Sequence, residues 1–294
     1  MIGVMDNVAQ CATATILPTC HPEEPAKVQG LSIRYRGYLS ASNTCSVSCL
    51  GQANRKHREI AMSSVVKNIV LVHGAFADGS SWSKVIPLLQ ELGYKAVAVQ
   101  NPMTSLADEV AFTKRIIALQ DGPVILVGHS WGGAVITQAG DDSKVAALVF
   151  VTAYAPETGQ SANDASSPFG WTEGQKQIRV DGEKFATLTA EGMREYIAEG
   201  LPMKERELAL AVQGQSYGPM FDEKLTVAAW KTKPTWAVIS TKDQMLPPAM
   251  QESAAKRMGA KTTILSTCHM SILEEPAKVT AVIDDAAKNA LNNQ

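Results

Sequence analysis

The stretch PVILVGHSWGGAVITQA, residues 123–139, combines a strand pattern, a turn and a helix pattern. PVILVGH is a continuous apolar run, which is typical of a parallel strand buried on both faces. WGGAVITQA, at 131–139, has the length and composition of a short helix. Between them, GHSWG fits the pattern G-x-S-x-G, in which a strand runs into a serine on a sharp turn and a helix leaves it. We therefore expect the hydroxyl of Ser130 to be exposed at the carboxyl end of a parallel sheet.

The same alternation continues on both sides of this stretch. Apolar runs predict further strands at 68–72, 94–100, 145–153, 234–240 and 261–266. Helical spacing of apolar residues predicts helices at 81–92, 106–119, 248–258 and from Glu274 onward. Strands that alternate with helices form parallel sheets with right-handed crossovers. The expected fold class is therefore α/β, with a mostly parallel sheet of about six strands and helices on both faces.

The alternation stops at about Tyr154 and resumes after residue 230. The segment between is polar and helical in pattern, with scattered large apolar residues. An insertion of this size between two strands of one sheet is typical of a cap or lid. We therefore predict a small helical cap at about 154–230. The large apolar side chains expected to contact a substrate are Phe76 and, in the cap, Phe169, Trp171, Met203 and Tyr217.

A serine hydroxyl needs a base within hydrogen-bond reach before it becomes a good nucleophile. The chain has five histidines, and only His269 follows Ser130, in a loop after the last predicted strand. The acid that orients this base should lie between the two in sequence, just after a strand, which is the position of Asp243. Its carboxylate would accept the ring N–H of His269 and stabilise the imidazolium. Asp222 is the next candidate for the acid, although it lies in the cap segment.

A tetrahedral intermediate on Ser130 would also need hydrogen-bond donors for its oxyanion. One expected donor is the backbone N–H of Trp131, the residue after the nucleophile. The second should come from the loop HGAF at 73–76, which follows the first predicted strand. We predict the N–H of Ala75 in this role, with the N–H of Phe76 as the alternative.

Residues 1–61 contain no Trp and no Phe, so this segment is a poor candidate for an independent core. Within it, TILPTCHPEEPAKV at 15–28 nearly repeats TILSTCHMSILEEPAKV at 263–279. The hypothesis is that 1–61 is an atypical extension, a remnant of a related copy or a misread start, ahead of a domain at 62–294. The alternative is a genuine arm packed on that domain, in which LSIRYRGYL at 31–39 could add a strand.

The net charge is −2 and the isoelectric point about 6.2, so the composition favours neither nucleic acid nor an anionic membrane as a partner. No Cys and His cluster has the spacing of a metal site, and no nucleotide-binding glycine motif is present. The N-terminus lacks a clear signal peptide. We expect a cytoplasmic protein without metal or cofactor whose partner is a small molecule; the sequence does not indicate an oligomeric state.

With these motifs in serial order, residues 62–294 resemble the α/β-hydrolase superfamily. Within it, they look closest to capped bacterial esterases related to plant methyl-salicylate esterases and hydroxynitrile lyases. The resemblance implies a cofactor-free Ser-His-Asp enzyme whose cap helices shape an apolar pocket. The lyases carry a lysine directly after the catalytic histidine and a threonine after the loop histidine, where this chain has Met270 and Gly74.

The expected function is that of a serine carboxylesterase that hydrolyses small to medium apolar esters through an acyl-enzyme on Ser130. One alternative is a small-molecule receptor that keeps the hydrolase fold without turnover. A cofactor-free perhydrolase or a lyase is the other.

Overall fold

The structure is a computed structural model, which describes residues 65–291. The predictions for residues 1–61, including the repeat at 15–28 and the possible strand at 31–39, lie outside the described residues. The predicted domain start at 62 lies outside them as well.

A six-stranded sheet with the order β2-β1-β3-β4-β8-β9 forms the centre of the described domain, and neighbouring strands are parallel. This confirms the predicted α/β fold class and the expected number of strands. The strands are β1 (Asn68–Val72), β2 (Lys95–Ala98), β3 (Val124–Ser130), β4 (Val145–Ala153), β8 (Thr235–Ser240) and β9 (Lys261–Leu265).

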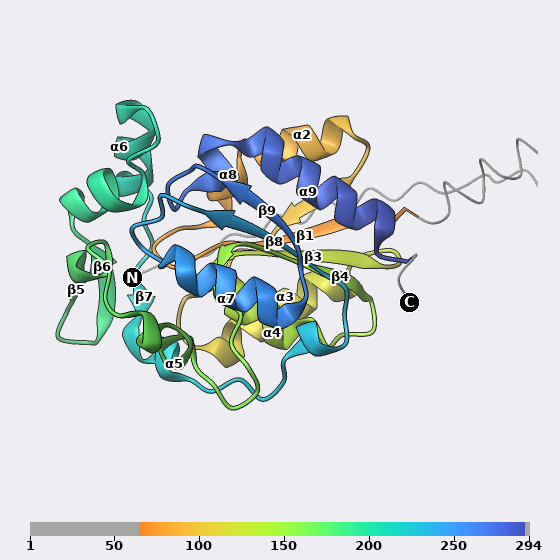
Figure 1. The fold of residues 1–294 in the computed structure, drawn as a ribbon, viewed down its shortest axis with the longest axis horizontal. Coiled ribbons are helices and arrows are strands. Elements are labelled where there is room, and N and C mark those ends of the chain that lie inside the picture. Colours follow the sequence, from red (N-terminus) through yellow and green to blue (C-terminus); the bar gives the residue numbers. More distant parts are fainter. Residues whose placement is uncertain (1–64, 292–294) are drawn as a thin grey trace, which may run out of the picture. The chain divides into compact units, whose positions relative to one another are not determined.

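Helices cover both faces of this sheet (Figure 1). Helices α2 (Val85–Glu91) and α9 (Pro276–Asn289) pack on one face, and α8 (Ser271–Glu274) precedes α9. The opposite face carries α3 (Leu106–Ala118), α4 (Gly132–Ala139) and α7 (Pro248–Met258). The described residues also form short 3-10 turns: η1 (Gly79–Trp82), η2 (Ser167–Phe169), η3 (Gln175–Gln177), η5 (Gly218–Asp222) and η6 (Ala229–Lys231).

Strands β1, β3 and β4 are buried along their whole length because both of their faces are covered. In β1, Ile69 and Leu71 contribute to the core beneath α2 and α9. Val70 and Val72 alternate with them and contribute to the core beneath α3 and α4. This burial on two faces is the physical reason why these strands have continuous apolar sequences rather than an alternating pattern.

Two of the predicted helices are interrupted. The pattern at 81–92 becomes the 3-10 turn η1 followed by α2, and Asp78 caps the turn through its side chain, which accepts from the N–H of Ser80. The last predicted helix becomes α8 and α9, because Pro276 in the first turn of α9 begins a new helix.

The segment between β4 and β8 lies at the carboxyl ends of the parallel strands (Figure 1). It contains helices α5 (Ala162–Ser166) and α6 (Met203–Ala211) and a π-helical turn, η4 (Gly192–Ile197). It also contains an antiparallel sheet of β5 (Ile178–Val180), β6 (Phe185–Leu188) and β7 (Ser216–Tyr217). The predicted helical cap is thus helical in part, and it also contains a small sheet that the sequence does not indicate, because such short strands do not show a period of two.

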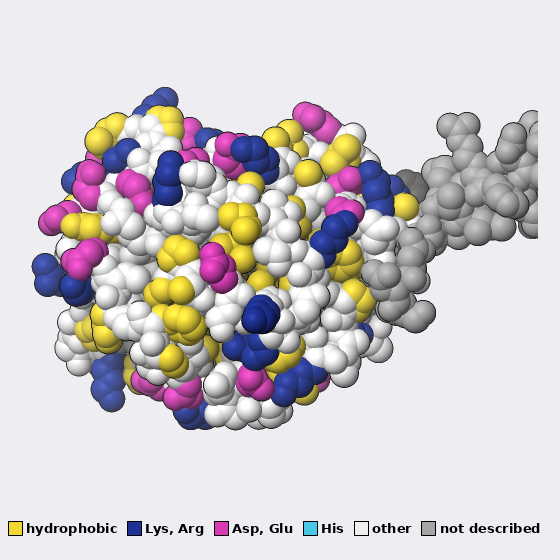
Figure 2. Space-filling model, viewed as in Figure 1, with side chains coloured by type: hydrophobic (Ala, Val, Ile, Leu, Met, Phe, Trp, Pro, Cys, Tyr) yellow, Lys and Arg dark blue, Asp and Glu magenta, His cyan; other side chains and the backbone are white. Residues whose placement is uncertain are grey.

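Positive and negative side chains are interspersed on the face drawn in Figure 2, without a large patch of one sign. Among residues 65–291, none of the helices is both long and apolar enough to cross a bilayer.

Candidate active site

Ser130 stands at the junction of β3 and α4, on the turn that the sequence motif predicts. Its backbone φ is 53°, in the left-handed region that non-glycine residues rarely adopt. The glycines around it permit a close approach of backbones: a Cβ on Gly128 would lie 2.5 Å from the carbonyl oxygen of Gly132. A Cβ on Gly132 would lie 2.5 Å from the carbonyl oxygen of Val72. The motif needs glycine at both positions because no side chain fits there.

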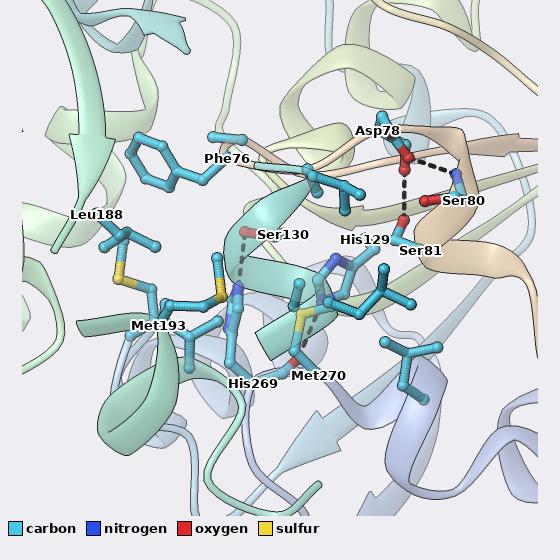
Figure 3. Close-up of a pocket in the computed structure, with 18 of the residues that line it drawn as sticks. Phe76, Asp78, Ser80, Ser81, His129, Ser130, Leu188, Met193, His269 and Met270 are labelled. Atoms are coloured by element: carbon cyan, nitrogen blue, oxygen red, sulfur yellow. Dashed lines mark hydrogen bonds between the residues drawn. The ribbon is translucent and has the colours of Figure 1, made fainter. Parts of the chain in front are cut away.

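The structure brings Ser130, His269 and Asp243 together from three separate loops. His269 Nε2 lies 2.9 Å from Ser130 Oγ (Figure 3). On the other side of the ring, His269 Nδ1 lies 2.9 Å from Asp243 Oδ2. A carboxylate is only an acceptor, so Nδ1 carries the proton and Nε2 accepts the hydroxyl proton of Ser130. All three side chains are buried or nearly so. This is the geometry that a nucleophile, a base and an orienting acid require.

The carboxylate of Asp243 is held by hydrogen bonds on both oxygens. Oδ1 accepts from the backbone N–H groups of Met245 and Leu246, at 2.7 and 2.9 Å. Oδ2 accepts from Gln251 Nε2 at 2.8 Å in addition to the histidine. Gln251, on α7, is a positioning residue that sequence reasoning missed, since an isolated glutamine in a helix gives no signal. The alternative acid, Asp222, instead accepts a hydrogen bond from Asn163 within the cap segment.

The loop 73–76 approaches Ser130 closely, since a Cβ on Gly74 would lie 2.7 Å from the Cβ of Ser130. Ala75 lines the same cavity as Ser130 and His269. The N–H of Phe76 is already engaged, because it donates to Ser216 Oγ at 3.2 Å. This geometry favours Ala75 over Phe76 as the partner of Trp131 in an oxyanion hole.

Two other histidines near the site are neutral supports rather than bases. His129 Nε2 donates to the backbone oxygen of His269 at 2.9 Å, and burial together with the neighbouring His269 lowers the pKa of His129 to about 3. His73 Nδ1 donates to the backbone oxygen of Gly74 at 2.8 Å, and burial lowers the pKa of His73 as well. Both side chains therefore hold the loops that carry the reacting groups.

A cavity of about 240 Å³ opens onto Ser130 and His269. Apolar side chains of the cap and of the loop 73–76 lie on one side of Ser130, and the polar residues of the 78–81 turn lie on the other (Figure 3). Lys84 and Glu205 also line the cavity and form a 2.6 Å ion pair between the sheet domain and α6. The apolar lining from the cap consists of Leu188, Met193, Ile197, Leu208, Ala209, Val212 and Phe221.

Of the predicted substrate-contacting residues, Phe76 lies in this cavity, whereas Phe169, Trp171, Met203 and Tyr217 do not line it. Trp171 is 76% exposed and Met203 56% exposed. Tyr217 packs its ring on Phe185 within the small sheet. These four predictions are corrected: size and apolarity identified large side chains in the cap, but not the direction in which the cap backbone points them.

No group of three or more His, Cys, Asp or Glu side chains that could hold a metal ion occurs within the described residues.

A parallel α/β sheet that carries a hydrogen-bonded set of Ser, His and Asp at its carboxyl end is the arrangement found in hydrolases of the α/β-hydrolase fold. The chain belongs to the alpha/beta hydrolase family, whose family model matches residues 69–282. The predicted superfamily, fold and hydrolase class are thereby confirmed.

Two relatives match about three quarters of the chain. It is 27% identical to salicylic acid-binding protein 2 of Nicotiana tabacum over 253 residues, 75% of this chain and 97% of that protein. It is 26% identical to a pyrethroid hydrolase of Sphingobium wenxiniae over 253 residues, 76% of this chain and 88% of that protein. The crystal structure of polyneuridine aldehyde esterase shares the fold, with a TM-score of 0.66, 20% identity and coverage of 75% of this chain and 99% of that one.

Proposed function

We propose that this protein is a serine carboxylesterase that hydrolyses small to medium apolar esters. The observation that supports the proposal best is the hydrogen-bonded series Asp243–His269–Ser130, which ends in a mostly apolar cavity.

The reaction follows from these positions. Ser130 Oγ attacks the ester carbonyl carbon while His269 Nε2 takes the hydroxyl proton, and Asp243 stabilises the imidazolium. The N–H groups of Ala75 and Trp131 donate to the oxyanion of the tetrahedral intermediate. The C–O bond of the leaving alcohol then breaks, and the alkoxide oxygen takes the proton from His269. A water molecule, deprotonated by His269, then attacks the carbonyl carbon of the acyl-enzyme and forms a second tetrahedral intermediate. The bond from this carbon to Ser130 Oγ breaks, His269 returns the proton to Oγ, and the acid is released.

The cavity supports the stated substrate class. Its volume is below the range of roughly 300–1,000 Å³ that is usual for drug-sized ligands. Among residues 65–291, the charged residues in its lining are Asp78, Lys84 and Glu205, and the lysine is already paired, so this part of the chain offers no free cation to an anionic substrate. Two relatives bear the names pyrethroid hydrolase and methylesterase, which agrees with ester substrates.

A non-catalytic receptor is the second candidate, because one relative is named as a salicylic acid-binding protein. Peroxyacid formation would use the same three residues and remains an alternative activity. Cyanohydrin cleavage has less support, since Met270 occupies the cavity-lining position where the lyases carry lysine.

The test is steady-state hydrolysis of p-nitrophenyl esters from acetate to decanoate. We expect wild-type turnover with an optimum at short or medium chain length, and Ser130→Ala should lower kcat/KM by about 10⁴-fold or more. Ser83→Ala, an exposed serine at the same cavity, is the matched control and should retain activity. A wild type that binds esters without consuming any of them would support the receptor instead. Activity that survives Ser130→Ala would contradict the proposed nucleophile.

A further inference from the structure

A carboxylic acid lies fully buried behind the nucleophile turn and takes no direct part in the proposed reaction. Glu109, on α3, has no exposed surface. Within the described part of the chain, the charged groups that bear on it are the carboxylates Glu223 and Asp108, which oppose its ionisation. Burial of an acid without a cationic partner is costly, so its position calls for a physical reason.

The hydrogen bonds of Glu109 lead to both predicted oxyanion donors. Its Oε2 accepts from the indole Nε1 of Trp131 at 2.7 Å, and Trp131 is the residue whose backbone N–H follows the nucleophile. The same Oε2 accepts from Asn101 Nδ2 at 3.2 Å. The backbone N–H of Asn101 in turn donates to His73 Nε2 at 3.1 Å.

The hydrogen bonds that run from Glu109 through Asn101 and His73 end on the peptide group that contains the other predicted donor, the N–H of Ala75. With Nε2 occupied as an acceptor, the proton of His73 resides on Nδ1, which donates to the backbone oxygen of Gly74. That carbonyl and the N–H of Ala75 belong to one planar trans peptide, so they point in opposite directions. Holding the Gly74 oxygen against His73 therefore sets the direction of the Ala75 N–H.

We propose that Glu109 is a positioning residue for the oxyanion hole, holding Trp131 directly and Ala75 through Asn101 and His73. The inference rests on the proposed esterase function, because it assigns a role in stabilising that reaction's tetrahedral intermediate. Burial, opposed by the hydrogen bonds from Trp131 and Asn101, raises the pKa of Glu109 to about 8. A neutral side chain with an acceptor oxygen therefore serves this position at neutral pH, and glutamine meets that requirement.

The experiment compares Glu109→Gln, Glu109→Leu and Trp131→Phe, which retains the ring but lacks the indole N–H. Glu109→Leu and Trp131→Phe should each lower kcat by about 10- to 100-fold with KM changed less than about 3-fold, because the lost interaction acts in the transition state. Glu109→Gln should restore kcat to within about 3-fold of wild type, because its amide oxygen can accept the same bonds. Thr113→Val, one turn further along the same buried face of α3, is the packing control and should leave kcat unchanged.

A second readout is the inhibition constant of an alkyl trifluoromethyl ketone, which forms an oxyanion adduct with a reactive serine. Trp131→Phe should weaken this inhibition by the same factor as kcat, and the double variant should be no worse than Glu109→Leu alone, because Glu109→Leu already removes the bond to Trp131. Strictly additive losses, or losses confined to KM, would overturn the proposal. Because wild-type turnover and Ser130→Ala test the esterase independently, an active wild type with an unaffected Glu109→Leu or Trp131→Phe contradicts this inference alone.

Discussion

The parallel sheet and the cap segment between β4 and β8 use apolar residues in different ways. The central strands bury every residue, and their side chains fill two cores, one beneath each layer of helices. In the cap, α6 has no buried residue, and Trp171, Met203 and Leu208 are largely exposed. The sheet thus holds Ser130, His269 and Asp243 at set distances, whereas the cap contributes cavity walls. Changes in the first region should affect the chemistry or the folding, and changes in the second should affect substrate fit.

The largest expected difference concerns two aspartates. Asp243→Asn should lower kcat/KM by about 10⁴-fold, because an amide in place of the carboxylate no longer fixes the tautomer of His269 or stabilises its charged form. Asp222→Asn, in the cap, should stay within about 2-fold of wild type. Hydrolysis of p-nitrophenyl butyrate by both variants measures the difference. Similar losses in the two variants would remove the distinction between sheet and cap.

Two glycines test the same contrast in folding. A Cβ on Gly133, at the start of α4, would lie 2.1 Å from the backbone oxygen of Tyr154, whereas a Cβ on Gly182 in the cap meets no atom within 4 Å. Gly133→Ala should destabilise the protein by about 3 kcal/mol or more, since backbone must move to admit the methyl group. Gly182→Ala should leave stability unchanged or raise it slightly. Thermal unfolding of both variants measures this, and equal Tm values would contradict the expectation.

The raised pKa of Glu109 predicts a pH dependence of stability. With a folded-state pKa of about 8 and an unfolded value near 4.3, the folded protein keeps a proton that the unfolded chain has already released. This contribution to stability is complete below about pH 4 and is lost as the pH rises through about 8. Glu109→Gln should therefore flatten the decline by about 2 kcal/mol between pH 6 and pH 8. Urea unfolding at several pH values checks it; parallel curves for the two proteins would argue against a proton held at this site.

The smallest effects should come from the cap. Met193 lines the cavity, and Met193→Ala should raise KM for the longer esters about 3- to 10-fold, because each lost methylene contact contributes roughly 0.8 kcal/mol or less. Trp171→Ala should change KM by less than about 2-fold, since its side chain is 76% exposed and outside the cavity lining. KM measured across the ester series separates the two. A larger effect from Trp171 would mean that the cap presents a different face to the substrate.

The sequence predicts the elements of the parallel sheet domain more accurately than those of the cap. Strands β1 and β4 begin and end where the apolar patterns predict, because a strand buried on two faces needs an unbroken apolar run. Helix α7 also has the predicted bounds. In the cap, β5 and β6 are only 3 and 4 residues long, too short for an alternating pattern to be distinguished from a helix or loop.

The sequence by itself determined the α/β architecture and indicated Ser130, His269 and Asp243 as the reacting group, because local motifs in a set serial order require that arrangement. Only the tertiary structure showed that Gln251 supports Asp243 and that Glu109 connects Trp131 with Asn101. It also decided which cap residues face the cavity. These hydrogen bonds and cavity contacts join side chains from different helices and strands. Which side chains meet depends on the directions of the backbone segments, and no short stretch of sequence encodes those directions.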